Sequence, residues 1–229
     1  MININQQKPI KQDIERNGIT KPLLIKEVFQ SIQGEGPYTG VPATFIRLGG
    51  CNLQCSFCDE DYTTHLVEAV LSEIIDGCSQ ELVILTGGEP FAQDIRPLVH
   101  GLLDVGKSVQ IETNGTLSLP AFPYDEVAIV VSPMTGKLAQ AIMFNCTVYK
   151  YVVGVEDKDS PDGLPTAPTH EGGKHSPAKP PNKHVTTYLM PRDDKDKTKN
   201  MANNMTAFHL CMKFGKVLTT QMQKTIGVK

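Results

Sequence analysis

Three cysteines lie close together in the run GGCNLQCSFCDEDYT: Cys51, Cys55 and Cys58. Their C-x3-C-x2-C spacing offers three thiolates that can hold three irons of a four-iron cluster. The fourth iron then has no protein ligand and stays open to a small molecule. A structural metal site fills every coordination position, whereas a site that lacks one ligand serves chemistry. The spacing therefore predicts a reactive iron–sulfur centre.

Two simpler explanations of the cysteines are weaker. Zinc sites usually pair two C-x2-C knuckles, and this chain has one triplet and no second knuckle. His65 could supply a fourth zinc ligand, but it opens a predicted helix. Chance is a poor explanation for three cysteines within eight residues. The other cysteines have no partner at ligand spacing and are expected to be ordinary buried thiols: Cys78, Cys146 and Cys211.

Composition limits the class of protein. The chain has 229 residues, of which 40% are hydrophobic, enough for the core of one domain spanning 1–229. A net charge of −3 predicts no basic face, so we expect no direct nucleic-acid partner. We find no apolar run of about twenty residues that would span a membrane. The polar N-terminus lacks a signal-peptide core, and six cysteines in an unexported chain indicate reduced thiols, so we expect a cytoplasmic protein.

Short β-branched runs alternate with helical patterns, which predicts an α/β fold with a mainly parallel sheet. In such a sheet functional residues gather in loops at the carboxyl ends of strands. The cysteine loop follows Leu48 and the run TGGEP follows Leu85, as this rule requires. The predicted strands are Ala43–Leu48, Leu82–Leu85, Val109–Glu112, Val127–Val131, Thr147–Val153 and Val185–Leu189.

Helical spacing of apolar residues predicts helices over His65–Asp76, Asp94–Val105 and Asn200–Phe214. In the last of these the apolar side chains are Met201, Met205, Phe208 and Met212, and a methionine stripe usually packs into a core. The following residues, Val217–Met222, are expected to form a last strand or extended segment.

The segment 157–184 differs in composition, with six of the chain's sixteen prolines and no Phe, Tyr or Trp. Such a segment buries little surface and is expected to be a flexible insertion. It contains His170, His175 and His184, for which a solvated loop is a better explanation than a metal site.

Phe57 completes the pattern C-x3-C-x-φ-C, where φ is an aromatic residue, and this pattern resembles the radical S-adenosylmethionine superfamily. The resemblance implies a partial (β/α) barrel and a 4Fe-4S cluster whose open iron binds S-adenosylmethionine. It also implies reductive cleavage of that cofactor to a 5′-deoxyadenosyl radical, which takes a hydrogen atom from substrate.

The second motif, Thr86-Gly87-Gly88-Glu89-Pro90, resembles the GGEP loop that binds the methionine amino group in that superfamily. Taken alone, a Gly-Gly pair after a strand is a turn, as are Thr113-Asn114-Gly115 and Ser132-Pro133. By resemblance, the cofactor contacts are Phe57, Cys58, Asp59, Gly88, Glu89, Thr113, Asn114, Ser132, Pro133 and Met134.

A third motif lies before the cysteines, where FQSIQGEG is followed by FIRL. This arrangement resembles the 7-carboxy-7-deazaguanine synthase family, which converts 6-carboxy-5,6,7,8-tetrahydropterin to 7-carboxy-7-deazaguanine with release of ammonia. The resemblance implies that Glu35 pairs with the guanidine-like edge of the pterin and that Arg47 grips its carboxylate. The implied substrate contacts are Ile32, Gln33, Gly34, Glu35, Arg47, Thr86 and Gln223.

The simpler explanation makes Glu35 and Arg47 surface residues of a loop and a strand. An arginine within an otherwise apolar strand argues against it, because an inward arginine needs an anionic partner.

The chain departs from the family pattern at several positions. The family places a threonine at a magnesium ion where this chain has Glu60, so we expect Glu60 to replace that hydroxyl as ligand. The competing possibility turns Glu60 outward and weakens the dependence on magnesium. Met134 stands where a lysine is common, and Gln223 stands where a histidine is common, which puts details of the pocket in doubt.

The resemblance also implies a homodimer and a flavodoxin- or ferredoxin-like reductant. Two alternatives share parts of the pattern. A glycyl-radical activating enzyme has the same cluster and GGEP loop but acts on a protein, which leaves the QGEG run and Arg47 unexplained. A zinc-stabilised, non-catalytic module would explain the cysteines alone.

Overall fold

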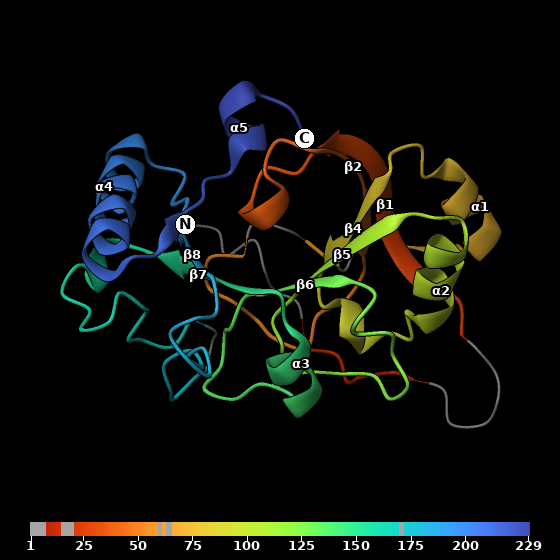
Figure 1. The fold of residues 1–229 in the computed structure, drawn as a ribbon, viewed down its shortest axis with the longest axis horizontal. Helices are drawn as coiled ribbons and strands as arrows, with labels where there is room; N and C mark the ends of the chain where they lie inside the picture. Colours follow the sequence, from red (N-terminus) through yellow and green to blue (C-terminus); the bar gives the residue numbers. More distant parts are fainter. Residues whose placement is uncertain (1–7, 15–20, 59–60, 63–65, 170–171) are drawn as a thin grey trace.

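The computed structural model describes residues 8–14, 21–58, 61–62, 66–169 and 172–229. Figure 1 shows a curved sheet with α1 and α2 beside its β1 end and α4 beside its β8 end. The helices are α1 (Leu71–Gly77), α2 (Arg96–Asp104), α3 (Gln140–Asn145), α4 (Lys197–Phe214) and α5 (Met222–Ile226). The short 3-10 turns are η1 (Gly36–Tyr38), η2 (Pro90–Ala92) and η3 (Val155–Asp157). No described helix is both long and apolar enough to cross a membrane.

One sheet joins all the described strands in the order β3-β1-β2-β4-β5-β6-β7-β8-β9, and its two end strands do not pair with each other. Pairing is parallel from β2 to β9, so the sheet forms the predicted partial barrel. The strands are β1 (Leu23–Ile32), β2 (Pro42–Leu48), β3 (Val67–Ala69), β4 (Leu82–Gly87), β5 (Ser108–Thr113), β6 (Ala128–Val131), β7 (Val148–Val153), β8 (Thr187–Pro191) and β9 (Val217–Leu218).

The central strands are short apolar runs because helices and loops cover them. Val83, Ile84 and Leu85 of β4 are fully buried, as strands of a parallel sheet usually are. Parallel pairing brings the carboxyl ends of β2, β4, β5 and β6 to one edge. The cysteine loop, the GGEP loop and the segments after Thr113 and Val131 therefore meet there, as predicted.

Strand β1 has no counterpart among the predicted strands. Its sequence LLIKEVFQSI mixes charged and apolar residues, because only Leu23 and Ile25 of this strand are buried. It runs antiparallel to β2 and places Ile32 beside Pro42, at the amino end of β2. The QGEG run therefore begins at the end of β2 opposite to the cysteine loop.

The predicted helix over His65–Asp76 was wrong in its first part. Val67–Ala69 forms the edge strand β3 against β1, and the helix begins at Leu71; residues 63–65 lie outside the described residues. β-branched Val67 and Val70 favour an extended chain, and the two are 64% and 56% exposed rather than in a buried helical stripe.

The methionine stripe of α4 does not pack into the core, so that prediction was wrong. Met201 and Met212 are 71% and 73% exposed, and Met205 and Phe208 are 49% and 43% exposed. The helix instead buries its other face against β8 and η3. That buried face contains Asn203, Thr206, Ala207, Leu210 and Cys211.

The C-terminal part also differs from the prediction. Only Val217–Leu218 of the predicted segment is a strand, and Met222 begins α5. Within 157–184, Leu164 is buried in the core, and Tyr151 donates a hydrogen bond to the carbonyl of Ala178 at 2.5 Å. His175 and His184 are exposed, and His170 lies outside the described residues. The flexibility of this segment stays a prediction.

Candidate functional site

A cavity of about 470 Å³ lies within the curve of the sheet. Its wall contains residues of β2, β4, β5, β7 and β8, and loops after β1, β2 and β6 complete it. The predicted site residues that line this cavity are Gln33, Glu35, Arg47, Cys51, Cys55, Phe57, Cys58, Thr86, Gly88, Thr113, Asn114, Ser132, Met134 and Gln223. Most of the predicted metal, cofactor and substrate residues therefore meet at one place.

Four other predicted residues do not line the cavity. Ile32 ends β1, Gly34 lies under the C-terminal segment, and Glu89 and Pro133 are buried. Asp59 and the proposed magnesium ligand Glu60 lie outside the described residues.

The cysteine loop forms one end of the cavity. Cys51, Cys55 and Cys58 are half-buried thiols, and Cys58 Sγ donates to the Tyr62 hydroxyl at 3.3 Å. Burial raises the pKa of both Cys51 and Cys55 to about 12. Such thiols lose their protons when a metal takes the proton's place.

This donor set fits a cluster. No three His, Cys, Asp or Glu side chains in the described part of the chain gather as ligands of one metal ion. A four-iron cluster does not need such a gathering, because each thiolate binds a different iron. Cys51, Cys55 and Cys58 would therefore hold the cluster.

The GGEP loop packs directly on the cysteine loop. Gly87 has φ +114°, and a Cβ added to Gly88 would lie 1.6 Å from the carbonyl oxygen of Gly50. The backbone N–H of Glu89 donates to that same oxygen at 2.9 Å. Glycine is needed at position 88 because no side chain fits between the two loops.

Glu89 is fully buried and ties the GGEP loop to the end of β5. Its carboxylate accepts hydrogen bonds from Phe91 N at 3.1 Å, Thr113 Oγ1 at 2.7 Å and Asn114 N at 2.8 Å. The pKa of this carboxyl group is raised to about 7, because burial raises it by more than the three hydrogen bonds lower it. The structure thus gives Glu89 a structural role, and its contact with a cofactor stays a prediction.

This carboxyl group should make folding stability depend on pH. A folded-state pKa of about 7 lies above the ordinary 4.5, so the folded protein binds the proton more tightly than the unfolded chain does. The stabilisation is complete below pH 4.5 and is lost as the pH rises through 7. At about 1.4 kcal/mol per pKa unit, the loss is on the order of 3 kcal/mol.

Urea denaturation at pH 5 and pH 8 tests this, with Glu89→Gln and the exposed control Glu126→Gln. Glu89→Gln should lose less stability than the wild type on going from pH 5 to pH 8, and Glu126→Gln should lose as much as the wild type. Equal losses in all three proteins would contradict a raised pKa at Glu89.

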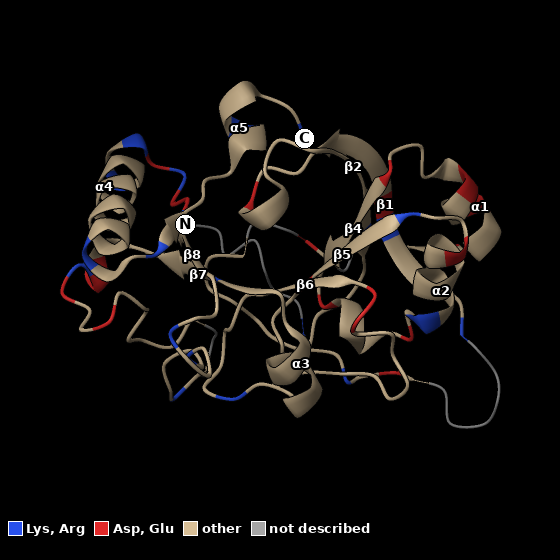
Figure 2. Cartoon of the chain, in the orientation of Figure 1, with Lys and Arg blue, Asp and Glu red and all other residues tan. Residues whose placement is uncertain are grey.

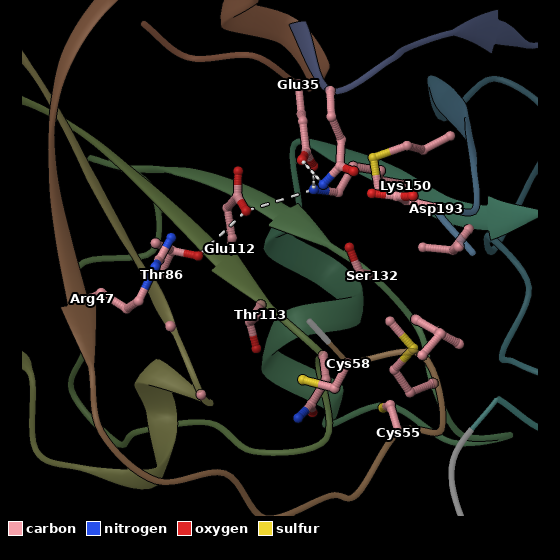
Figure 3. A pocket seen from close by; sticks show the side chains of 18 of the residues that line it. Glu35, Arg47, Cys55, Cys58, Thr86, Glu112, Thr113, Ser132, Lys150 and Asp193 are labelled. Atoms are coloured by element: carbon pink, nitrogen blue, oxygen red, sulfur yellow. Dashed lines mark hydrogen bonds and ion pairs between the residues drawn. The ribbon is translucent and has the colours of Figure 1, made fainter. Parts of the chain in front are cut away.

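A carboxylate cluster of Glu35, Glu112 and Lys150 forms the other end of the cavity (Figure 3). Lys150 Nζ lies 2.5 Å from Glu35 Oε2 and 3.6 Å from Glu112 Oε2. Burial lowers the pKa of Lys150, but the charges of Glu112 and Glu35 outweigh burial and hold it above its ordinary range. Burial likewise raises the pKa of Glu35, but Lys150, together with the hydrogen bonds from Gln221 and Gln223, lowers it below its ordinary value. Glu35 and Lys150 are therefore both charged at neutral pH.

Amide and hydroxyl groups complete this cluster. Gln33 Nε2 donates to Glu112 Oε1 at 3.0 Å, and Thr86 Oγ1 donates to Glu112 Oε2 at 3.5 Å. Gln33 Oε1 in turn accepts from the backbone N–H of Glu35 at 3.1 Å. The prediction that Glu35 is more than a surface residue is supported, since its side chain is 11% exposed.

Sequence reasoning missed Glu112 and Lys150. Lys150 is a charged residue inside a largely apolar strand, the same signal that singled out Arg47, and applied to every strand that signal would have found it. Glu112 shares β5 with Ser108, Gln110 and Thr113, so the same signal does not mark it.

Arg47 is held in place by its neighbours on β1. Its Nη1 lies 2.6 Å from Glu27 Oε1, and its guanidinium lies 5.2 Å from the centre of the Phe29 ring. The arginine side chain is 18% exposed and lines the cavity. The anionic partner that an inward arginine needs is thus Glu27, and a grip on a substrate carboxylate stays a prediction.

The C-terminal segment covers the end of the cavity that contains Glu35, Glu112 and Lys150. Gln221 Nε2 donates to Glu35 Oε1 at 3.0 Å, and Gln223 Nε2 lies 3.5 Å from that oxygen. Met222 N donates to the Gly34 carbonyl at 3.2 Å. A Cβ on Gly34 would lie 1.6 Å from Gln223 Oε1, so the glycine permits this approach.

Known proteins resemble this chain over most of its length, although no family model matches it. A 7-carboxy-7-deazaguanine synthase of Rhodospirillum rubrum is 37% identical over 227 residues, which cover 92% of this chain and 94% of the relative. One of Rickettsia prowazekii is 34% identical and covers 90% of this chain and 89% of the relative. The crystal structure of QueE from Escherichia coli has a TM-score of 0.64 and 28% identity, covering 87% of this chain and 94% of that one.

These matches do not favour a glycyl-radical activating enzyme or a zinc module. The identity and coverage of the relatives, together with the cysteine loop and carboxylate cluster in one cavity, assign the family. The chain belongs to the 7-carboxy-7-deazaguanine synthase family.

Proposed function

We propose that this chain converts 6-carboxy-5,6,7,8-tetrahydropterin to 7-carboxy-7-deazaguanine with loss of ammonia, as a radical S-adenosylmethionine enzyme of 7-deazapurine biosynthesis. One observation carries the proposal beyond family membership. A single cavity has three cysteine thiols at one end and a buried set of carboxylates, amides and a lysine at the other. Such a cavity can hold a radical-generating cofactor and a polar heterocycle next to each other.

The residues at the cysteine end hold the cofactors. Cys51, Cys55 and Cys58 would hold the 4Fe-4S cluster, which when bound would supply the reducing chemistry that S-adenosylmethionine needs. The cofactor lies against backbone at Gly88 and against Thr113, Asn114, Ser132 and Met134, which all line this part of the cavity. In Figure 3, Thr113 and Ser132 lie between the labelled cysteines and the carboxylate cluster.

The residues at the far end hold the pterin. Its N–C–N edge carries N–H groups, for which carboxylate and amide oxygens are the natural acceptors. Glu35 and Gln33 provide these, and Arg47 supplies a cation for the substrate carboxylate while Glu27 fixes its orientation. Gln223 replaces the family's histidine at this end, and Glu60 is the proposed magnesium ligand.

The test is a reaction under anaerobic conditions. The protein is reconstituted with iron and sulfide and incubated with S-adenosylmethionine, a reductant and 6-carboxy-5,6,7,8-tetrahydropterin, and products are identified by mass spectrometry. We expect 7-carboxy-7-deazaguanine and ammonia in equal amounts. Cofactor cleavage without deazaguanine, or a colourless protein that contains one zinc, would refute the proposal.

We further propose a cytoplasmic homodimer that receives electrons from a flavodoxin- or ferredoxin-like protein. The exposed stripe of α4 supports the dimer. Met201, Met205, Phe208 and Met212 are spaced by four, three and four residues, which aligns them along one side of the helix. This spacing reads the same in both directions, so a two-fold axis can pack Met205 of one copy against Phe208 of the other. Figure 2 shows lysines near the ends of α4 and no Lys, Arg, Asp or Glu in the turns between them.

Light scattering with size-exclusion chromatography checks this interface. The wild type should have twice the 25.1 kDa mass of the chain, and Met205→Lys/Phe208→Lys should elute as a folded monomer. The control Lys199→Gln/Lys213→Gln changes exposed residues of the same helix outside the stripe and should remain dimeric. A stable dimer in the first variant would exclude α4 as the interface.

A further inference from the structure

Lys150 is the least expected group in the cavity. It stands in the middle of β7 with its residue 5% exposed, and a buried ammonium is costly unless it is paired. Its pairing is unequal, with Glu35 Oε2 at 2.5 Å and Glu112 Oε2 at 3.6 Å. An apolar residue would hold β7 in the core equally well, so the cost of burying this charge suggests a role in the site.

The hydrogen-bonding capacity of this lysine exceeds what its described partners use. An ammonium group has three N–H donors; the carboxylate of Glu35 accepts from one of them, and Glu112 forms an ion pair with the group at 3.6 Å. Lys150 also lines the cavity, so a bound ligand can reach it. Beside it, Glu35 accepts from Gln221 and Gln223 on one oxygen and from Lys150 on the other. The cavity therefore offers a cationic donor next to a carboxylate acceptor.

The guanine-like edge of a deazaguanine or pterin has the complementary pattern. It presents a lactam oxygen, which accepts, followed by a ring N–H and an amino group, which donate. A carboxylate can accept from the two N–H groups but repels the oxygen. A lysine beside that carboxylate can donate to the oxygen, so the two side chains together match the whole edge.

We propose that Lys150 is a specificity-determining residue that donates to the lactam oxygen of the substrate while Glu35 accepts from the adjacent N–H groups. This inference rests on the proposed function, because it requires a pterin in this cavity. The second carboxylate, Glu112, balances the charge of Lys150. Gln33 and Thr86 donate hydrogen bonds to Glu112 and so hold this carboxylate, and with it the lysine, on the cavity wall. The site thereby selects 4-oxo over 4-amino heterocycles.

Equilibrium dialysis with two stable ligands tests the inference without turnover. The ligands are 6-carboxypterin and 2,4-diaminopteridine-6-carboxylate. The second has an amino group in place of the lactam oxygen, so it donates a hydrogen bond at the position where 6-carboxypterin accepts one. The protein is the anaerobic, cluster-loaded enzyme with S-adenosylmethionine, at pH 8. The free energy of a hydrogen bond to a charged group corresponds to at least about a tenfold change in affinity, so the wild type should bind 6-carboxypterin at least about tenfold more tightly.

In Lys150→Met this preference should fall by at least about tenfold relative to the wild type. The single variant leaves the buried carboxylate of Glu35 without its cation and could misfold. The double variant Lys150→Met/Glu35→Gln removes both charges of the closest pair and should lose the preference as well. The matched control is Lys224→Met, a lysine at the exposed side of the cavity that pairs with Asp193 at 2.9 Å. It should change both affinities by a similar factor and leave their ratio intact.

The outcomes separate this inference from the proposed function. If the wild type binds 6-carboxypterin but the ratio of affinities is the same in both Lys150 variants, Lys150 does not read the lactam and this inference alone fails. If the wild type binds neither ligand, the proposed function fails, and this inference fails as well because it depends on that function.

Discussion

Cys55→Ala is expected to leave a folded protein that is colourless and inactive. Cys55 provides one of three thiolates, and two cannot hold a four-iron cluster firmly when the fourth iron already lacks a protein ligand. Without the cluster nothing generates the radical, and enzymatic rate enhancements commonly exceed about 10⁶, so activity should fall below about one-thousandth of wild type. Iron and sulfide content, absorbance near 400 nm and deazaguanine formation are the measurements.

The matched control is Cys146→Ala. Cys146 is half-buried beside α3 and does not line the cavity, so its loss should leave iron content and colour unchanged. Full iron content and colour in Cys55→Ala would mean that this residue is not a ligand. The circular dichroism of both variants reports whether either change disturbs the fold instead.

Gly88→Ala should have the next largest effect, because the new Cβ meets backbone rather than a movable side chain. It would lie 1.6 Å from the oxygen and 2.4 Å from the carbon of the Gly50 carbonyl, so one of the two loops must move. Gly50 directly precedes Cys51, and the displacement therefore shifts a predicted cluster ligand. Overpacking costs about 1–3 kcal/mol, and misplacement of reacting groups by about 1 Å can cost roughly 100-fold in rate.

Urea denaturation measures the loss of stability, and turnover per cluster measures the loss of rate. Gly77→Ala is the control, because a Cβ there meets nothing within 4 Å and the position ends α1 with an ordinary backbone. It should be neutral or stabilising by up to about 1 kcal/mol. Equal stability and equal turnover in the two variants would show that the loops tolerate a side chain at position 88.

The sequence predicted those parts of the fold in which local pattern and final environment agree. The run at 82–85 is a strand because an apolar segment with β-branched residues has few other stable placements, and all four of its residues are buried as expected. The same reasoning failed for α4, where Met201 and Met212 have helical spacing but face outward. Spacing identifies one side of a helix, but it does not tell whether that side meets the sheet or solvent.

In the candidate site, too, some residues could be recognised from the sequence and others could not. Cys51, Cys55 and Cys58 could be recognised from sequence because ligands that share one loop keep their spacing in the chain. Glu35, Glu112 and Lys150 come from three separate elements and are as much as 115 residues apart, so no local pattern links them. Likewise, Gln221 reaches Glu35 across 186 residues.

The sequence by itself therefore determined the cysteine triplet, for which it predicts a reactive centre, and the alternation of strands and helices, since both depend on residues that are neighbours in the chain. Only the tertiary structure decided which charges face one another in the cavity. The antiparallel β1 brings Glu35 to the end opposite the cysteines, and parallel pairing places Lys150 within reach of it. The physical reason is that a buried charge needs a partner, and the partner is chosen by strand order rather than by sequence distance.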